Sequence, residues 1–270
     1  MNRDAVIRRN NVRVLGQADG PALVLVQGFG CDQVIWDRML PWFTGSYKVV
    51  LLDHAGTGGA DPAAYDPVKY AELDGYMRDL QEVLEVLDLQ DATVVGHSIA
   101  GSMALAAAAE DPRIGRLVLL CTSARYLNDG GYLGGFDPKD VDKVLTAVEL
   151  NYPLWAAAAA SAVTSAPGSS AISSELTTRL CRLQPEYVHD FLAMAFAMDI
   201  RPVLPRISTP ALLLQTPGDP LTPAAASEYL RDHLSTSTFQ ALDSYGSMPH
   251  ITAPQATAEA ILTYLAVPRG

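Results

Sequence analysis

Residues 93–101 read TVVGHSIAG, and the rest of the chain can be understood from them. A short apolar run ends at Val95, Gly96 follows, and a run of small helix-forming residues, GSMALAAAAE, begins at Gly101. This order is typical of a strand, a sharp turn and a helix. Such a turn holds its central residue, Ser98, in strained backbone angles and exposes the side chain at the carboxyl end of a sheet. We therefore predict that Ser98 is a nucleophile, with free N–H groups of the next helix facing a developing oxyanion.

The motif departs from the usual nucleophile turn at one position. The full pattern is G-x-S-x-G, and its last position here is Ala100. An ordinary serine in a buried strand–helix turn is the alternative, since short motifs also match by chance. The catalytic interpretation requires an aspartate, a histidine and a second oxyanion donor from the rest of the chain, in the order Ser, Asp, His.

Composition narrows the class of protein. A chain of 270 residues suffices for one large α/β domain with an insertion, or for two small domains. The net charge of -11 argues against a nucleic-acid surface. Three separated cysteines (Cys31, Cys121 and Cys181) predict reduced thiols and a cytoplasmic setting. The beginning, MNRDAVIRRNNVRV, does not resemble a signal peptide, and no apolar run is long enough to span a membrane. We expect no metal and no cofactor.

The hydrophobic pattern predicts an alternation of strands and helices. A hairpin is predicted at 5–15, and strands are predicted at 22–26, 47–53, 93–95, 116–121, 210–214 and 237–242. Helices are predicted at 36–43, 73–89, 101–110, 224–234 and 255–265. Continuous aliphatic strands such as ALVLV are buried on both faces, which indicates a mostly parallel sheet with helices on each side.

The alternation stops after the strand at 116–121. Residues 123–205 contain no clear strand, and helical stretches are predicted at 138–150, 153–164, 173–183 and 185–198. We therefore divide the chain into a core (1–122 and 206–270) and a helical lid (123–205) that would cover a cleft. Residues 156–160 are all alanine. They form either a plain helix or a helix without the bulk to block a cavity.

Asp219 and His250 complete the chemistry that Ser98 needs. Asp219 follows the predicted strand at 210–214, and His250 lies in a predicted loop after the last strand. A serine hydroxyl is a weak nucleophile, so an imidazole must take its proton, and a carboxylate must orient that imidazole. We predict the triad Ser98, Asp219 and His250, with the backbone N–H groups of Phe29 and Ile99 as oxyanion donors.

Other histidines and aspartates are rivals for these roles. The side chain of His97 should diverge from that of its neighbour Ser98, so we interpret His97 as a packing residue or a cleft wall. The remaining rivals fall in a glycine-rich loop, a lid helix, an exposed helix, the lid loop and the end of the last strand, in the order His54, His189, His233, Asp129 and Asp243.

Several longer motifs resemble one branch of the α/β-hydrolase fold, the bacterial stress regulator RsbQ and the karrikin and strigolactone receptors of plants. The most specific are YLND at 126–129 with GGF at 134–136, and Asn151-Tyr152 with Trp155. Further matches are GFGCDQ at 28–33 with Trp36, Tyr76, Gly96-His97-Ser98, Phe196 with Asp199 and Arg201, and Pro249-His250.

The resemblance implies a four-helix lid over a deep apolar pocket, the same triad and the same oxyanion donors. It also implies slow hydrolysis of a small hydrophobic ester or lactone, with a regulatory protein partner such as a PAS-domain phosphatase or, in plants, an F-box protein. Ala159 stands where plant relatives place a phenylalanine, which predicts a wider pocket. The expected lining residues are Phe29, His97, Tyr126, Trp155, Ala159, Phe196 and Met248.

The sequence therefore predicts a serine hydrolase of the α/β-hydrolase fold that acts on a small hydrophobic ester or lactone as a ligand-sensing regulator. Two alternatives stay open. One is a metabolic esterase or carbon–carbon bond hydrolase without a signalling role. The other is a ligand-binding regulator in which the triad is idle.

Overall fold

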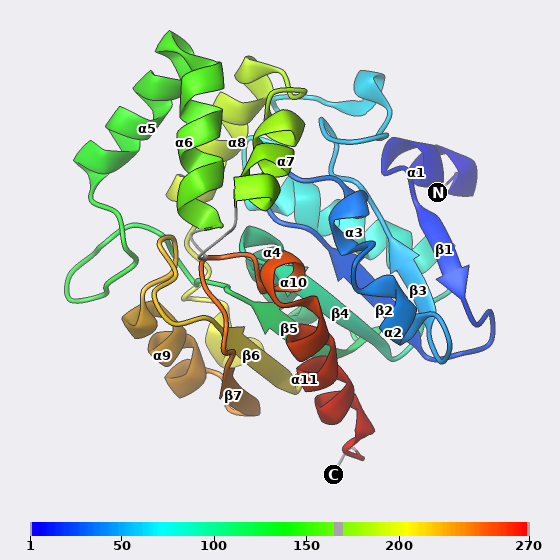
Figure 1. Ribbon diagram of the computed structural model, residues 1–270. Coiled ribbons are helices and arrows are strands. Elements are labelled where there is room, and N and C mark those ends of the chain that lie inside the picture. Colours follow the sequence, from blue (N-terminus) through cyan, green and yellow to red (C-terminus); the bar gives the residue numbers. More distant parts are fainter. Residues whose placement is uncertain (1, 165–169, 269–270) are drawn as a thin grey trace.

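The computed structural model describes residues 2–164 and 170–268, and these residues form a central sheet of seven strands between layers of helices (Figure 1). The strand order is β1-β3-β2-β4-β5-β6-β7. β1 runs antiparallel to β3, and the other neighbouring pairs are parallel. The strands are β1 (Arg13–Gly16), β2 (Ala22–Val26), β3 (Lys48–Leu51), β4 (Ala92–His97), β5 (Ile114–Leu120), β6 (Ala211–Gln215) and β7 (Ser237–Ala241). The predicted α/β-hydrolase sheet is confirmed.

The central strands are apolar on both faces because each face supports a separate core. On β2, Leu23 and Leu25 belong to one buried cluster, and Val24 and Val26 belong to the other. Successive side chains of a strand point to opposite faces, so a continuous aliphatic run fills both layers. The run ALVLV thus needs helices above and below the sheet.

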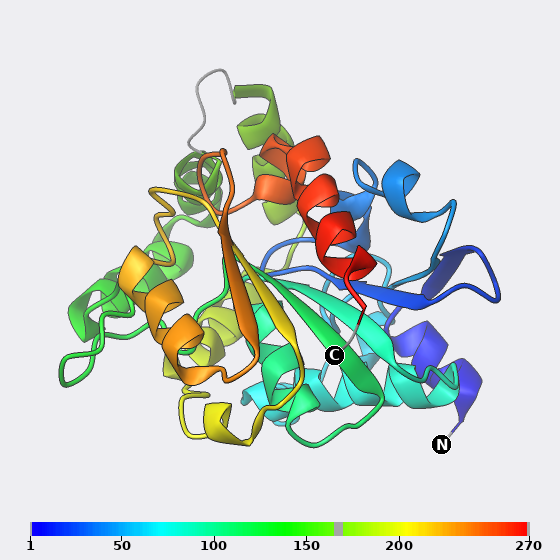
Figure 2. The same cartoon turned by 90° about the horizontal axis from the view of Figure 1, so that it is seen from below.

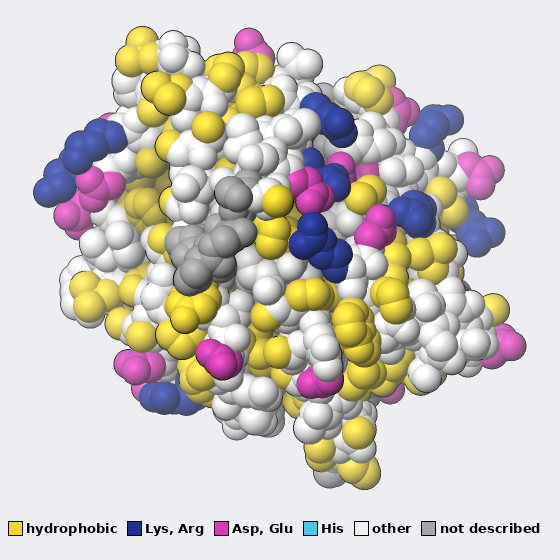
Figure 3. All heavy atoms as spheres, viewed as in Figure 1, with side chains coloured by type: hydrophobic (Ala, Val, Ile, Leu, Met, Phe, Trp, Pro, Cys, Tyr) yellow, Lys and Arg dark blue, Asp and Glu magenta, His cyan; other side chains and the backbone are white. Residues whose placement is uncertain are grey.

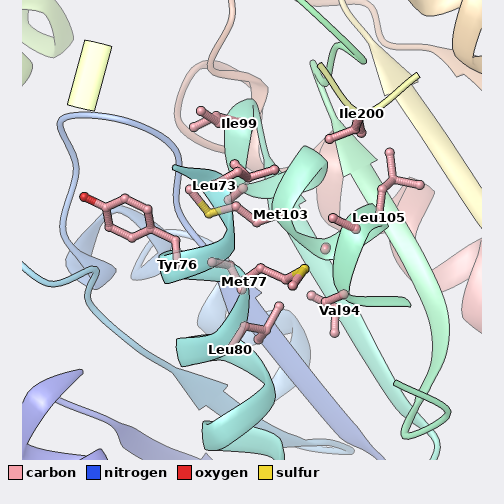
Figure 4. Close-up of a cluster of buried hydrophobic side chains, with 14 of the residues drawn as sticks. Leu73, Tyr76, Met77, Leu80, Val94, Ile99, Met103, Leu105 and Ile200 are labelled. Atoms are coloured by element: carbon pink, nitrogen blue, oxygen red, sulfur yellow. The ribbon is translucent and has the colours of Figure 1, made fainter. Parts of the chain in front are cut away.

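Helices cover the two faces of the sheet (Figures 1 and 2). Figure 4 shows the core that α3 and α4 build against the sheet, where Leu73, Met77 and Leu80 lie near Met103 and Val94. The helices of the core are α1 (Arg3–Arg9), α2 (Leu40–Phe43), α3 (Leu73–Val86), α4 (Ile99–Ala108), α9 (Ala224–His233), α10 (Pro249–Thr252) and α11 (Pro254–Ala266), with 3-10 turns η1 (Gln33–Trp36), η2 (Pro62–Ala64) and η3 (Leu204–Arg206).

The predicted hairpin at 5–15 is wrong. Residues 3–9 form α1, because the side chain of Asn2 caps the helix by accepting from the backbone N–H groups of Asp4 (3.0 Å) and Ala5 (3.4 Å). Arg8 and Arg9 lie in its last turn, where the helix dipole favours positive charge. The alternation of apolar and polar residues misled the prediction, since the cap and the charges at the two ends decide this segment.

Four helices follow β5 in the described part of the lid region: α5 (Pro138–Leu150), α6 (Tyr152–Val163), α7 (Ser170–Leu180) and α8 (Pro185–Ala197). They lie together at one end of the sheet (Figure 1). β5 and β6, which flank this insertion in the sequence, are neighbours in the sheet. The insertion therefore leaves the sheet intact and places its helices beside the carboxyl end of β4.

The surface and the thiols have simple arrangements. Acidic and basic side chains are interspersed on the face drawn in Figure 3. Cys31 and Cys121 are buried, Cys181 is exposed, and all three are free thiols. Within residues 2–164 and 170–268, no helix has the length and apolar character needed to cross a bilayer.

Candidate active site

Ser98 occupies the sharp turn between β4 and α4. Its backbone angles are φ 55° and ψ -126°, a region that non-glycine residues rarely adopt. Its N–H donates to the carbonyl of Leu120 on β5 (2.7 Å), which anchors the turn to the sheet. A Cβ on Gly96 would lie 2.6 Å from the backbone of Ala100 and Gly101, so only glycine allows this close approach. The strain predicted for Ser98 is confirmed.

The loop after β2 presses against the turn. A Cβ on Gly28 would lie 2.7 Å from Nδ1 of His97 and 3.1 Å from Cβ of Ser98. The absence of a side chain at Gly28 therefore brings the backbone of Phe29 next to Ser98. Ile99 is the first residue of α4, and its N–H is among those that a helix leaves without an intrahelical acceptor. These positions suit the two proposed oxyanion donors.

An apolar cavity of about 340 Å³ lies over Ser98. Its volume is in the range of pockets that hold small molecules. Six of the seven predicted lining residues are in its wall, namely Phe29, His97, Trp155, Ala159, Phe196 and Met248. Tyr126 is outside the wall, but its hydroxyl hydrogen-bonds to Oγ of Ser98 (3.1 Å). Burial raises the pKa of Tyr126, so this phenol stays protonated.

Sequence reasoning missed several wall residues, most of which come from the folded lid. Phe136 packs on Phe196 with ring centroids 5.0 Å apart, and Trp155 packs on Phe29 at 6.2 Å. Other missed members are Val144, Leu176, Leu180 and Leu192 from the lid helices, and Leu221 and Ser247 from loops of the core. The helical spacing of the lid could have indicated the leucines, but it could not tell which face of each helix points to the cavity.

Asp219 lies beyond β6, as predicted, and its carboxylate is fully engaged. Oδ1 accepts from the backbone N–H groups of Leu221 (2.8 Å) and Thr222 (3.2 Å) and from the hydroxyl of Ser247. Oδ2 accepts from Nε2 of Gln215 (3.1 Å). Among the described residues, no histidine hydrogen-bonds to this carboxylate.

The structure does not bring His250 into the predicted triad. His250 is the second residue of the short helix α10, not part of a loop, and its ring is fully buried. It packs at a tilt against Trp36 (4.7 Å between ring centroids) and His97 (4.4 Å), and neither ring nitrogen has a hydrogen-bond partner among the described residues. Burial first, and then the nearby His97, hold the pKa of His250 well below its ordinary value. His250 is a packing residue in this arrangement.

His97 is a wall of the cavity, as the sequence suggested. Its Nε2 donates to the carbonyl of Ser247 (2.7 Å). Since a carbonyl oxygen only accepts, Nε2 carries the ring proton and Nδ1 is the free acceptor. Burial lowers the pKa of His97 to about 4, so its imidazole is neutral near pH 7.

A second cavity of about 520 Å³ has Gly30 and Cys31 in its wall. Its wall carries charged residues such as Asp53 and Arg179 and does not include Ser98. Asp53 fixes this loop by accepting from the N–H of Gln33 (2.7 Å) and from Nδ2 of Asn11 (2.7 Å). Within the described residues, no cluster of histidine, cysteine and carboxylate side chains could hold a metal ion.

The fold, the strained serine and the covered cavity define a class of protein. Residues 23–260 match the model of the alpha/beta hydrolase family. Because this match covers most of the chain, the protein belongs to the alpha/beta hydrolase family.

Individual relatives narrow the comparison. The chain is 36% identical over 247 residues to strigolactone esterase RMS3 of Pisum sativum, covering 90% of this chain and 92% of that one. It is 31% identical over 258 residues to karrikin insensitive 2 receptor CA of Petunia hybrida, covering 95% of both. The solved structure of olei00960, a hydrolase from Oleispira antarctica, superposes with a TM-score of 0.95 at 29% identity, covering 99% of this chain and 98% of that one. The predicted resemblance to the strigolactone and karrikin receptors is confirmed.

Proposed function

We propose that the protein binds a small hydrophobic ester or lactone in the cavity over Ser98 and hydrolyses it slowly, with Ser98 as the nucleophile. One observation carries this proposal. Ser98 is a strained residue at the start of α4, and it forms part of the wall of a cavity of about 340 Å³. Esterase relatives support the same class of substrate.

The cavity chemistry favours a neutral ligand. Its wall contains no Lys, Arg, Asp or Glu among the described residues, and its polar groups belong to Ser98, Ser247, His97 and the indole of Trp155. An ester or lactone can enter without losing the hydration of a charge. The carboxylate product would lose that hydration without a cation to replace it. We therefore expect the intact ester to bind more tightly than its acid.

The residues around the carbonyl group of a bound ester or lactone would have different roles in hydrolysis. Oγ of Ser98 attacks the carbonyl carbon, and the backbone N–H groups of Phe29 and Ile99 stabilise the oxyanion. Losing one such donor typically costs about 3–4 kcal/mol in the transition state. The hydroxyl of Tyr126 holds Oγ in place, but a protonated phenol does not remove its proton.

Regulation of a protein partner is the second candidate function. The observation that favours it is the hydrogen bond from Ser247 to Asp219. Ser247 takes the place at this carboxylate that an imidazole would need in order to reach Ser98, and a serine without an imidazole is expected to turn over slowly. A named receptor among the relatives points the same way. A partner of the PAS-domain phosphatase kind stays a prediction, and pull-down with and without ligand tests it.

Binding can be measured through Trp155, which lies in the cavity wall. Titration of the protein with γ-decalactone should change tryptophan emission. Hydrolysed γ-decalactone, a hydroxy acid, should bind at least about 10-fold more weakly because its charge would be buried unpaired. Trp155→Phe is the control, since it should remove the signal while a thermal-shift assay still reports binding. A signal that Trp155→Phe retains, or equal affinity for the acid, would sink the proposed site.

A further inference from the structure

Ser247 is fixed in a position next to Asp219. Its N–H donates to the carbonyl of Val163 (2.8 Å), and its own carbonyl accepts from Nε2 of His97 (2.7 Å). The preceding carbonyl, that of Gly246, accepts from Oγ1 of Thr216. The segment is thus held by the lid helix α6, by β4 and by the loop after β6. The side chain of Ser247 has little freedom and donates to Oδ1 of Asp219.

Ser247 and Ser98 face the same empty volume. Both belong to the wall of the cavity of about 340 Å³. Oγ of Ser98 pairs with Tyr126, and Oγ of Ser247 pairs with Asp219. The chain of hydrogen bonds from the carboxylate of Asp219 to Oγ of Ser98 is therefore broken between the hydroxyl groups of Ser247 and Ser98. In a working triad this interval holds an imidazole that bonds to both ends.

Neither nearby imidazole fills the interval. His97 uses Nε2 on the carbonyl of Ser247, and its Nδ1 faces Gly28. His250 is buried against Trp36, with no hydrogen bond from either ring nitrogen to a described residue. Moving His250 to Asp219 would require α10 to leave its packing, because the ring is fully buried there.

We infer that Ser247 occupies the position of the triad's base and that the protein has no imidazole between Asp219 and Ser98. This inference rests on the proposed function and explains why turnover would be slow. Ser247 is a positioning residue that satisfies the buried carboxylate, and a hydroxyl group cannot accept the proton of Ser98 at neutral pH. The site keeps its nucleophile, cavity and oxyanion donors, and it is suited to holding a ligand rather than to fast turnover.

Ser247→His should complete the site. The cavity beside Ser247 has room for the added ring, and Asp219 is already in place to accept from its Nδ1. In the acylation step, the proton of Ser98 passes to Nε2 while Oγ bonds to the carbonyl carbon. The bond from that carbon to the leaving oxygen breaks as Nε2 gives the proton to this oxygen, and the leaving group departs as an alcohol or phenol. In deacylation, water bonds to the acyl carbon and gives a proton to Nε2. Nε2 passes this proton to Oγ of Ser98 as the bond from Oγ to the acyl carbon breaks, which releases the acid and restores the serine.

The test compares hydrolysis of p-nitrophenyl butyrate by the wild type, Ser247→His and Ser247→Asn. The asparagine variant is the matched control, since it is polar and similar in size but is not a base. General-base catalysis typically contributes about 10²–10⁴-fold. We expect kcat/KM of Ser247→His to exceed that of both others by at least about 100-fold. We also expect a new pH dependence near that of a free histidine, about 6.5.

Two controls assign the gain. Ser98→Ala in the Ser247→His background should remove it, because the new base acts on Ser98. Folded Ser247→His with no more activity than Ser247→Asn would overturn the inference. If Ser247→His does not fold, His250→Phe decides the question, since phenylalanine keeps the ring contact with Trp36. Wild-type activity retained in His250→Phe supports the inference, and a loss of 10-fold or more in the folded variant, about 1.4 kcal/mol, refutes it.

The γ-decalactone titration separates this inference from the proposed function. Ligand binding without a gain from Ser247→His means that only the account of the base has failed. A Ser98-dependent gain without lactone binding supports the base position but contradicts the proposed class of ligand. The two statements can therefore fail independently.

Discussion

Gly28→Ala tests whether the loop after β2 and the turn at Ser98 form one rigid unit. The added Cβ would lie 2.7 Å from Nδ1 of His97, 3.0 Å from its carbonyl oxygen and 3.1 Å from Cβ of Ser98. Real Cβ atoms essentially never approach another heavy atom within 3.0 Å. His97 cannot retreat easily, because its Nε2 is bonded to Ser247. The loop or the turn must therefore move.

The expected cost follows from this overlap. Inserting a methyl group into a packed site typically costs about 1–3 kcal/mol. Urea unfolding followed by circular dichroism should report a loss of free energy of unfolding in that range. The same shift would move the N–H of Phe29 away from the carbonyl of a bound ester. The rate of p-nitrophenyl butyrate hydrolysis should then fall by at least about 10-fold. A decrease of this size is smaller than the decrease expected when one oxyanion donor is removed entirely.

Gly45→Ala is the matched control. A Cβ at Gly45 would meet no described atom within 4 Å, so stability should change by no more than about 0.5 kcal/mol. Equal unfolding free energies for Gly28→Ala and the wild type, with unchanged hydrolysis, would refute the idea that this contact sets the site.

Three further outcomes are expected. Tyr126→Phe should cost about 1 kcal/mol of stability in urea unfolding yet keep hydrolysis within about 10-fold, because the phenol only positions Ser98; a much larger rate loss would make Tyr126 a catalytic group. Ala159→Phe should fill the cavity and weaken γ-decalactone binding at least about 10-fold in fluorescence titration, and undiminished affinity would place the ligand elsewhere. Burial holds the pKa of His97 at about 4 in the folded protein, whereas the pKa of a histidine in the unfolded chain is about 6.5. Between these two pH values the unfolded chain binds a proton that the folded protein does not, so the free energy of unfolding should fall by about 3 kcal/mol as the pH drops from 6.5 to 4. His97→Asn should flatten this slope, and an unchanged slope would contradict the assignment.

Most of the fold could be predicted because its signals are local. The run ALVLV predicts β2 at the bounds observed, and 138–150 predicts α5 at the bounds observed. The sequence GHS between a strand and small helix-forming residues located the strained turn. Of the segment at 36–43, predicted as one helix, Trp36 is the last residue of η1 and only Leu40–Phe43 form α2. Such short pieces depend on tertiary packing rather than on propensity.

The candidate site was harder to predict because it depends on side-chain direction. Asp219 and His250 each follow a strand and come after Ser98 in the required order, so the sequence predicted both as members of a triad with Ser98. The structure separates them, since the first turn of α10 directs His250 toward Trp36 and leaves Ser247 on Asp219. A difference of three residues in a loop decides which side chain reaches the carboxylate. The run GSMPH contains both Ser247 and His250, but only the backbone path shows which of the two side chains faces Asp219.

Intact mass spectrometry of the wild type and Ser98→Ala during incubation with p-nitrophenyl butyrate tests the central claim most directly. The activated leaving group lets Ser98 react without a strong base, while removal of the acyl group by water still lacks one. We expect a butyryl adduct to accumulate on Ser98 of the wild type and to be absent from Ser98→Ala. Hydrolysis and labelling that persist unchanged in Ser98→Ala would contradict the claim that Ser98 is the nucleophile of this site.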